Sequence, residues 1–288
     1  MKVGLQFFSV RNSLKADPEG TMRKIAAIGY KNWETCSFNP DSPYNYGLDM
    51  PLDKAQALIK ELGVNIIGCH LLSKDLEPEN RAALIENLDY QAGINCWNPG
   101  LAALFANSLD EVLTYCGYMN EVGKLCKDRG MRFHYHNHHH EFLQFDGKYI
   151  LDIIAENTDP ELVDIEIDTF WAARGGMDPV ALIKKYGSRV TMIHQKDMSA
   201  DAKVNLLEHL SSRQAPVDRE ELNKFRKPTD FVEIGTGIMD IQAIIDAANE
   251  VGVKYITLEQ DMTLLDEIDS VTLSMKNFRE KYKNLDWE

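Results

Sequence analysis

Acidic and histidine side chains recur at one kind of position in this chain, at or near the end of short apolar runs. They are Glu34, His70, His136, His138, Asp168, His194 and Glu259, and Glu141 follows shortly after the fifth run. One acid at such a position is explained as the cap of a following helix, but six or more that include histidine are not. We therefore expect these side chains to meet at one site.

Two runs carry the strongest pattern. In LVDIEID, residues 162–168, Asp164, Glu166 and Asp168 alternate with β-branched apolar residues, and HYHNHHHEF, residues 134–142, alternates in the same way at its start. Alternation places every second side chain on one face of a strand. Burial of three carboxylates is costly unless they are paired or bind a metal, so we expect Asp168 to belong to the site.

Carboxylates mixed with imidazoles are typical ligands of Mn²⁺, Co²⁺, Mg²⁺ or Zn²⁺ and disfavour a thiolate-preferring metal. A bound divalent ion polarises a carbonyl and lowers the pKa of a coordinated hydroxyl or water. Proton abstraction beside a sugar carbonyl requires this stabilisation, because an enediolate places negative charge on oxygen. One divalent metal ion is therefore the predicted cofactor.

Short β-branched or aromatic runs alternate with amphipathic stretches along the whole chain. The predicted strands are 3–8, 32–36, 64–70, 94–97, 131–138, 162–168, 190–194 and 255–259. The predicted helices are 17–28, 52–62, 80–92, 109–128, 150–157, 179–186, 241–251 and 265–282. Asp17-Pro18 begins the first helix and Gly29 ends it, as is common for helix termini.

Eight strand–helix units without a break predict an α/β fold, a single (β/α)8 TIM barrel over residues 1–288. The strand ends of such a barrel meet at one mouth, where the residues described above would converge. A polar stretch at about 199–230 follows the seventh strand, and we expect a loop insertion there.

Composition narrows the class of protein. The net charge of −14 argues against a nucleic-acid partner, which requires a basic footprint. The N-terminus lacks a signal-peptide pattern, and no apolar run is long enough for a membrane span. The five cysteines form no C-x-x-C pair, which predicts reduced thiols in a cytoplasmic protein.

Several segments together resemble one known family. They read LQFFSVRNSLKADPEGTMRKIAAIGYKNWE, YHNHHHEF, DIEIDTFWAARGGMDPV, MIHQKDM, EIGTGIMD and ITLEQD, in this order along the chain. The chain resembles the sugar phosphate isomerase/epimerase superfamily of xylose-isomerase-like barrels, and within it a bacterial subgroup with a YHNHxxEF motif.

The resemblance implies a metal held by Glu, Asp, His and Glu. Asp168, His194 and Glu259 match the last three ligands. The first falls in the strand-five motif, where we favour Glu141, with His136 or His138 as the alternative.

Two positions depart from the keto-sugar epimerases of the superfamily. Trp171 stands where they carry a substrate-binding histidine, and Lys196 is the nearest cation to an arginine that follows their strand-seven motif. A histidine in place of the first glutamate would also remove one half of their acid/base pair. These departures favour a neutral keto-sugar, a keto-inositol or a 3-keto-glycoside over a phosphorylated substrate.

The main functional prediction is a metal-dependent isomerase or epimerase that moves a proton on a small keto-sugar through an enediolate. Glu141, Glu259, His136 and Lys196 are the predicted catalytic residues, with Glu34, His70, His138, Trp171 and Phe7 binding substrate. The alternative is a lyase or hydratase that acts on a 3-keto-glycoside or keto-inositol. A multinuclear-metal endonuclease and a non-catalytic sugar-binding barrel are further alternatives, and the protein could form a homo-oligomer.

Overall fold

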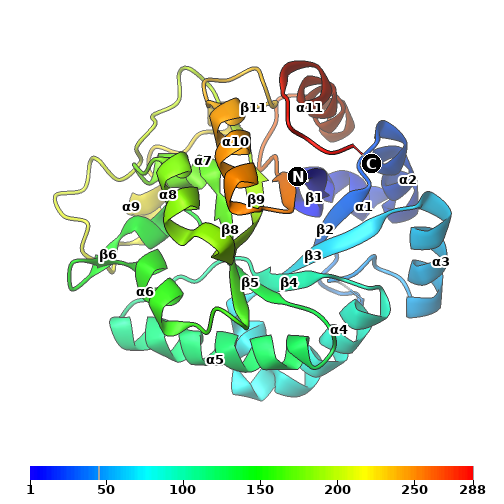
Figure 1. Ribbon diagram of the computed structural model, residues 1–288, viewed down its shortest axis with the longest axis horizontal. Coiled ribbons are helices and arrows are strands. Elements are labelled where there is room, and N and C mark those ends of the chain that lie inside the picture. The colour runs from blue at the N-terminus through cyan, green and yellow to red at the C-terminus, as the bar shows by residue number, and fades with distance from the viewer. Residues whose placement is uncertain (45, 288) are drawn as a thin grey trace.

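A closed barrel of parallel strands forms the centre of the protein (Figure 1). The structure is a computed structural model that describes residues 1–44 and 46–287. The barrel strands are β1 (Lys2–Gln6), β2 (Asn32–Cys36), β3 (Asn65–Leu71), β4 (Asn98–Leu101), β5 (Phe133–His136), β8 (Val163–Asp168), β9 (Val190–Gln195) and β12 (Tyr255–Leu258). Strand β1 pairs with β12 in parallel and closes the ring, which confirms the predicted (β/α)8 architecture.

Helices surround the barrel (Figure 1). The long ones are α2 (Pro18–Ile28), α3 (Leu52–Leu62), α4 (Arg81–Gly93), α5 (Leu109–Lys127), α6 (Ile150–Asn157), α8 (Pro179–Tyr186), α10 (Ile241–Val251) and α11 (Glu267–Lys281). The shorter ones are α1 (Arg11–Ala16), α7 (Thr169–Arg174) and α9 (Arg219–Asn223). Among the described residues, no helix has the length and apolar character needed to cross a membrane.

The helix boundaries follow from capping. The Asp17 carboxylate accepts from the amide of Gly20 at the start of α2, and Gly29 ends that helix in the left-handed conformation. Helix α10 begins in the same way at Asp240 and ends at Gly252, which has a φ of 87°. Helices α3, α6, α8 and α10 have the predicted bounds.

The fourth strand was wrongly predicted. Residues 94–97 do not form a strand: the amide of Cys96 donates to the carbonyl of Gln91, and Asn95 has a φ of 55°, so these residues form the turn that closes α4 after Gly93. Strand β4 begins at Asn98 and contains Pro99 and Gly100, which are poor strand formers and concealed it from sequence reasoning.

The predicted insertion leaves and re-enters the barrel at a small antiparallel ribbon. Strand β10 (Asp197–Met198) pairs with β11 (Phe231–Val232), and residues 199–230 lie between them. The insertion is fixed to the barrel by a buried ion pair, 2.7 Å long, between Arg174 of α7 and Asp230. Backbone hydrogen bonds from Leu206 to the carbonyl of Arg174 and from Gln144 to the carbonyl of Arg213, both 2.7 Å, also hold the insertion against the barrel.

Candidate metal centre and active site

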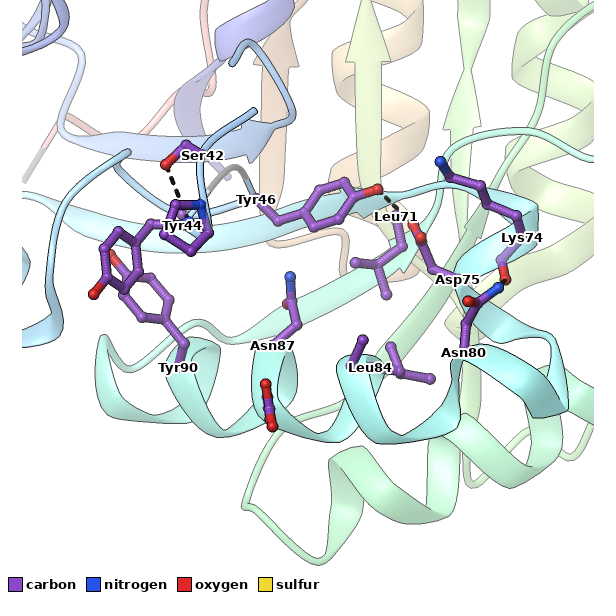
Figure 2. Close-up of a pocket in the computed structure, with 14 residues that line it drawn as sticks. Ser42, Tyr44, Tyr46, Leu71, Lys74, Asp75, Asn80, Leu84, Asn87 and Tyr90 are labelled. Carbon is purple, nitrogen blue, oxygen red and sulfur yellow. Dashed lines mark hydrogen bonds between the residues drawn. The ribbon is translucent and has the colours of Figure 1, made fainter. Parts of the chain in front are cut away.

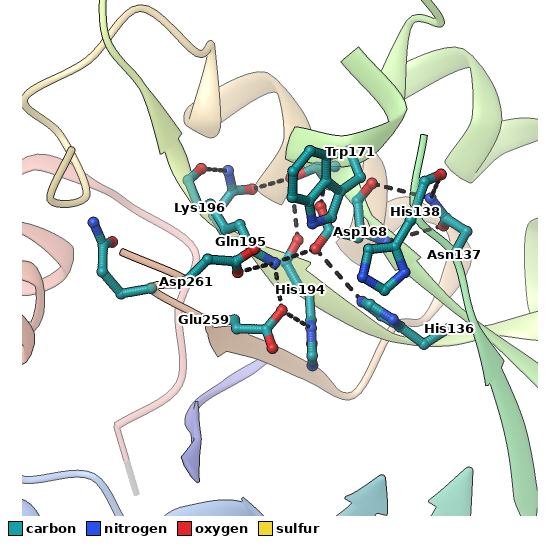
Figure 3. A network of polar contacts seen from close by, with 12 residues as sticks. His136, Asn137, His138, Asp168, Trp171, His194, Gln195, Lys196, Glu259 and Asp261 are labelled. Atoms are coloured by element: carbon teal, nitrogen blue, oxygen red, sulfur yellow. Dashed lines mark hydrogen bonds and ion pairs between the residues drawn. The ribbon is translucent and has the colours of Figure 1, made fainter. Parts of the chain in front are cut away.

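The ends of β5, β8, β9 and β12 bring one group of ligand atoms together at the barrel mouth (Figure 3). One side-chain atom from each of His136, Asp168, His194 and Glu259 lies within 4.8 Å of the others, and all four residues are buried. His194 Nδ1 is 2.9 Å from Glu259 Oε2, and His136 Nε2 is 3.5 Å from Asp168 Oδ2. Three of these residues were predicted as metal ligands, and His136 was the alternative for the fourth.

His136 supplies a test of whether this group fits a metal ion. Its Nδ1 lies 2.8 Å from the carbonyl oxygen of Ala102, which can only accept, so Nδ1 carries the proton. In the neutral ring the Nε2 lone pair therefore faces Asp168, and Nε2 has no hydrogen-bond partner although it is buried. A lone pair beside a carboxylate suits a cation between them, so the donor set fits a divalent ion of the predicted kind.

Lys196 lies fully buried against the same carboxylates. Its ammonium group donates to Asp168 and Glu259, and it is 3.3 Å from Asp261 (Figure 3). Burial disfavours the charged amine, but the three carboxylates outweigh it and raise the pKa of Lys196. The ammonium therefore stays charged and offsets part of the negative charge at the mouth.

A second layer of donors lies deeper in the barrel. His194 turns Nε2 towards Glu34 at 2.5 Å, and His70 Nε2 is 3.1 Å from Glu166. Glu34 is wholly buried, whereas His70 is slightly exposed and borders the mouth pocket. Of the two residues predicted to bind substrate here, only His70 reaches the pocket.

Glu141, the favoured first ligand, lies outside all the groups of possible ligands among the described residues. One of its oxygens accepts from the Tyr135 hydroxyl at 2.5 Å and the other accepts from the amide of His138 at 2.9 Å. Burial raises the pKa of Glu141 to about 7, and the two hydrogen bonds offset this only in part. Both oxygens hold the loop after β5, so the geometry favours His136 over Glu141 as the fourth ligand.

A pocket of about 260 Å³ opens onto the metal-ligand group. Its polar lining consists mainly of His70, His136, His138, Arg226, Glu259 and Asp261. A larger hollow of about 610 Å³ lies between α4 and residues 42–44 and 46–47, where Tyr46 donates to Asp75 (Figure 2). It shares no lining residue with the mouth pocket, so we place the candidate site at the smaller pocket.

The two aromatic residues predicted to stack on substrate do not line the pocket. Phe7 is fully buried with its ring 5.5 Å from that of Trp33, and its neighbour Phe8 borders the pocket instead. Trp171 is also buried and packs between His139 and the guanidinium of Arg226, at 5.1 Å and 4.9 Å from its ring. Both residues shape the walls behind the site.

Arg226 and Asp261 are pocket residues that sequence reasoning missed. Arg226 comes from the insertion, and its guanidinium donates to Asp261 at 3.2 Å. No local pattern marks Arg226, but Asp261 lies two residues after Glu259 in ITLEQD, and strand alternation could have indicated it. Burial and the nearby Glu259 raise the pKa of Asp261 to about 6, against the opposing effect of Lys196.

The three histidines after β5 have separate surroundings. His139 and His140 face the backbone carbonyls of Leu222 and Leu104, and burial lowers the pKa of each to about 3. His138 lines the pocket, its Nδ1 has no partner, and burial together with nearby histidines lowers its pKa well below the usual range. All three are therefore neutral at physiological pH, and His138 alone faces the pocket.

The family model described as a xylose isomerase-like TIM barrel matches residues 22–280. Among curated proteins, the inosose dehydratase of Clostridium beijerinckii is 27% identical over 168 residues, which is 57% of this chain and 52% of that protein. The corresponding protein of Clostridium tetani is 28% identical over 167 residues, again 57% of this chain and 52% of its own length. The chain thus spans about half the length of the curated relatives it matches.

Solved structures share the fold at lower identity. A sugar phosphate isomerase/epimerase from Parabacteroides distasonis superimposes with a TM-score of 0.77 and 20% identity, over 97% of this chain and 94% of that one. An IolI protein with a bound zinc atom gives 0.70 and 15%, over 99% and 100% of the two chains. Since the family model covers most of the chain and the barrel is closed, this protein belongs to the xylose isomerase-like TIM barrel family.

Proposed function

We propose that this protein is a divalent-metal-dependent lyase that removes water from a small monocyclic polyhydroxy ketone, such as a keto-inositol. The observation that carries the proposal is the pair of carboxylates at the end of β12, Glu259 and Asp261, which line one pocket with opposite pKa shifts. Two carboxyl groups whose surroundings separate their pKa values are suited to act as base and acid.

Glu259 is suited to accept a proton. Although burial raises its pKa, Lys196 and His194 outweigh burial and hold the pKa of Glu259 well below the usual range. It is therefore ionised and can take the proton from the carbon beside the substrate carbonyl. The metal ion held by His136, Asp168, His194 and Glu259 would supply a Lewis acid that stabilises the resulting negative charge on oxygen.

Asp261 is suited to donate a proton. With a pKa of about 6 it is partly protonated near neutral pH. Elimination breaks the bond between the β-carbon and its hydroxyl, and the proton from Asp261 turns the departing hydroxide into water. The enol that forms rearranges to a diketone, so the net change is the loss of one water molecule.

The pocket also limits the size of the substrate. Its volume of about 260 Å³ lies just below the usual range for ligand sites, about 300–1,000 Å³, and suits one ring better than a glycoside with two. Arg226, Asp261 and His138 offer donors and acceptors for hydroxyl groups around its rim. The curated relatives named above are inosose dehydratases, which supports the same substrate class.

Isomerisation or epimerisation, the main prediction from sequence, is the second candidate. It would need a second group to transfer the proton, and His138 is the candidate because it is neutral, lines the pocket and has an unpartnered Nδ1. In the barrel order β5, which precedes His138, is separated from β12 by β8 and β9. His138 therefore approaches the pocket from a different side than Glu259.

Incubation of the metal-loaded protein with keto-inositols and free ketoses in D₂O tests the proposal. By NMR we expect deuterium exchange at the α-carbon and loss of water, and in Asp261→Asn continued exchange with strongly reduced loss of water. Glu250→Gln, which changes an exposed carboxylate on α10, serves as the control. New stereoisomers without loss of water would favour the epimerase, and the absence of exchange with every substrate would refute both proposals.

A further inference from the structure

The deeper layer of donors is built from residues that share the inward face of the barrel with the mouth ligands. His134 and Glu166 lie two positions before His136 and Asp168 on β5 and β8, so alternation points all four in the same direction. Glu34 from β2 and His70 from β3 complete this layer from the other side of the ring. The layer therefore lies one step further into the barrel than the mouth group.

The polar atoms in this layer converge. His70 Nε2 is 3.2 Å from Glu34 Oε1 and 3.1 Å from Glu166 Oε2. On the other side, His194 Nε2 is 2.5 Å from Glu34 Oε2 and 3.3 Å from Glu166 Oε1. One ligand atom from each of these four residues lies within 4.8 Å of the others. Neighbouring ligands of a tetrahedral zinc ion are about 3.4 Å apart when each bond is about 2.1 Å, which is close to three of these four separations.

Several atoms in the layer lack a hydrogen bond. They are Glu34 Oε1, Glu166 Oε1 and His134 Nε2, and all three belong to side chains with no exposed surface. Each lies 3.2–3.3 Å from another polar atom of the layer but without the geometry of a hydrogen bond. Buried polar atoms seldom lack a hydrogen bond, so atoms of this kind that face one point fit a bound ligand.

The charge of the layer can be balanced either by protons on its histidines or by a cation. Among the ion pairs of the described residues, Glu34 and Glu166 contact only histidines and neither lysine nor arginine. His134 Nδ1 lies 2.8 Å from the carbonyl oxygen of Asn98 and holds a proton, and Nε2 faces Glu166 at 3.2 Å. Although burial opposes them, Glu34 and Glu166 raise the pKa of His70 to about 9 and hold that of His194 well above its usual range, so in the metal-free layer these two histidines carry the balancing charge. A divalent cation at this point would replace their two protons and keep the same charge balance.

We propose that Glu34, His70, Glu166 and the Nε2 atom of His194 form a second, interior site for a divalent cation of the zinc type. His194 would then present Nδ1 to the mouth ion and Nε2 to the interior ion. The interior set leaves no open side for substrate, as is typical of structural rather than catalytic zinc sites. His70 borders the mouth pocket and provides the route by which the ion enters.

This site does not depend on the proposed lyase activity, because its test counts metal ions. The protein is produced in medium with added zinc and manganese and is purified without chelator, and its metal content is measured by elemental analysis. We expect about two ions per chain in the wild type and about one in Glu166→Gln, which keeps the shape of the side chain. Asp164→Asn is the matched control: Asp164 lies two residues earlier on β8, is equally buried and pairs with Arg132, and its loss should leave both ions bound.

Anomalous X-ray diffraction from wild-type crystals at the zinc and manganese edges gives a second reading that needs no variant. A peak among Glu34, His70 and Glu166, separate from one beside Asp168, supports the proposal. A peak in the interior alone also supports it, and would refute the mouth metal on which the lyase depends. A peak at the mouth alone, or one ion per chain in both the wild type and Glu166→Gln, overturns the interior site and makes the layer a hydrogen-bonded support for His194.

Discussion

The role of Glu141 can be decided by one isosteric substitution, Glu141→Gln. A glutamine can keep both contacts of the glutamate, because its carbonyl oxygen can accept from the amide of His138 and its amide can donate to the oxygen of Tyr135. The substitution therefore removes the charge and leaves the loop after β5 in place. If Glu141 is not a metal ligand, the variant retains the full metal content of the wild type.

The raised pKa of Glu141 makes the stability of the protein depend on pH, and the size of the pKa shift sets the expected change in the free energy of unfolding. The pKa of Glu141 rises from 4.5 to about 7 in the folded protein, because the carboxyl group is fully buried. A raised pKa means that the folded state binds the proton more tightly, so the contribution of this proton to stability is complete below about pH 4.5 and is lost as the pH rises to about 7. A shift of this size corresponds to about 3 kcal/mol at most.

Urea unfolding of the wild type and of Glu141→Gln at a series of pH values measures this effect. The compared quantity is the free energy of unfolding of the variant minus that of the wild type. We expect this difference to increase by up to about 3 kcal/mol between about pH 4.5 and pH 7.5, because only the wild type loses the stabilising proton. Glu77→Gln removes a carboxylate that accepts from a tyrosine hydroxyl outside the barrel and controls for loss of such a contact. His136→Leu is the metal control and should lower the metal content. A difference that stays constant with pH would refute the argument from burial, and loss of an ion from Glu141→Gln would restore Glu141 as a ligand.

Three further predictions concern the insertion and the interior of the barrel. Arg174→Met leaves Asp230 buried without its cation and should lower the free energy of unfolding by about 3–5 kcal/mol in urea titrations, and a loss below about 1 kcal/mol would contradict a role as anchor. Arg226→Gln removes the pocket guanidinium supplied by the insertion, so KM should rise several-fold while the melting temperature stays within about 2 °C. An unchanged KM would exclude contact between Arg226 and the substrate. Gly100→Ala would place a Cβ atom 2.3 Å from the ring of His134, so we expect about 1–3 kcal/mol of destabilisation in the same titrations, whereas a neutral effect would show that the ring moves freely.

Most of the secondary structure could be predicted from the sequence because its signals are local. Caps such as Asp17 and Gly29, and alternation within runs such as 163–168, depend on residues a few positions apart. The prediction failed at β4, where Pro99 and Gly100 concealed a strand that is stabilised by pairing with β3 and β5.

The sequence by itself determined the class of the site. Alternation along each parallel strand decides which side chains face into the barrel. Because the barrel is closed, the ends of its strands meet at one mouth. Asp168, His194 and Glu259 could therefore be identified without coordinates. Their role as metal ligands stays a prediction, as do the catalytic assignments of Lys196 and Glu259.

Only the tertiary structure decided which other residues join them. His136 and Glu141 lie five positions apart in one segment, and only contacts with Ala102 and with Tyr135 distinguish a free ring nitrogen from a carboxylate that is already engaged. Arg226 reaches the pocket from the insertion, which the Arg174–Asp230 ion pair and backbone hydrogen bonds hold against the barrel. Which residues join the site depends on contacts between residues remote in sequence and on the path of a loop. A local pattern in the sequence contains no information about such contacts or about the path of a loop.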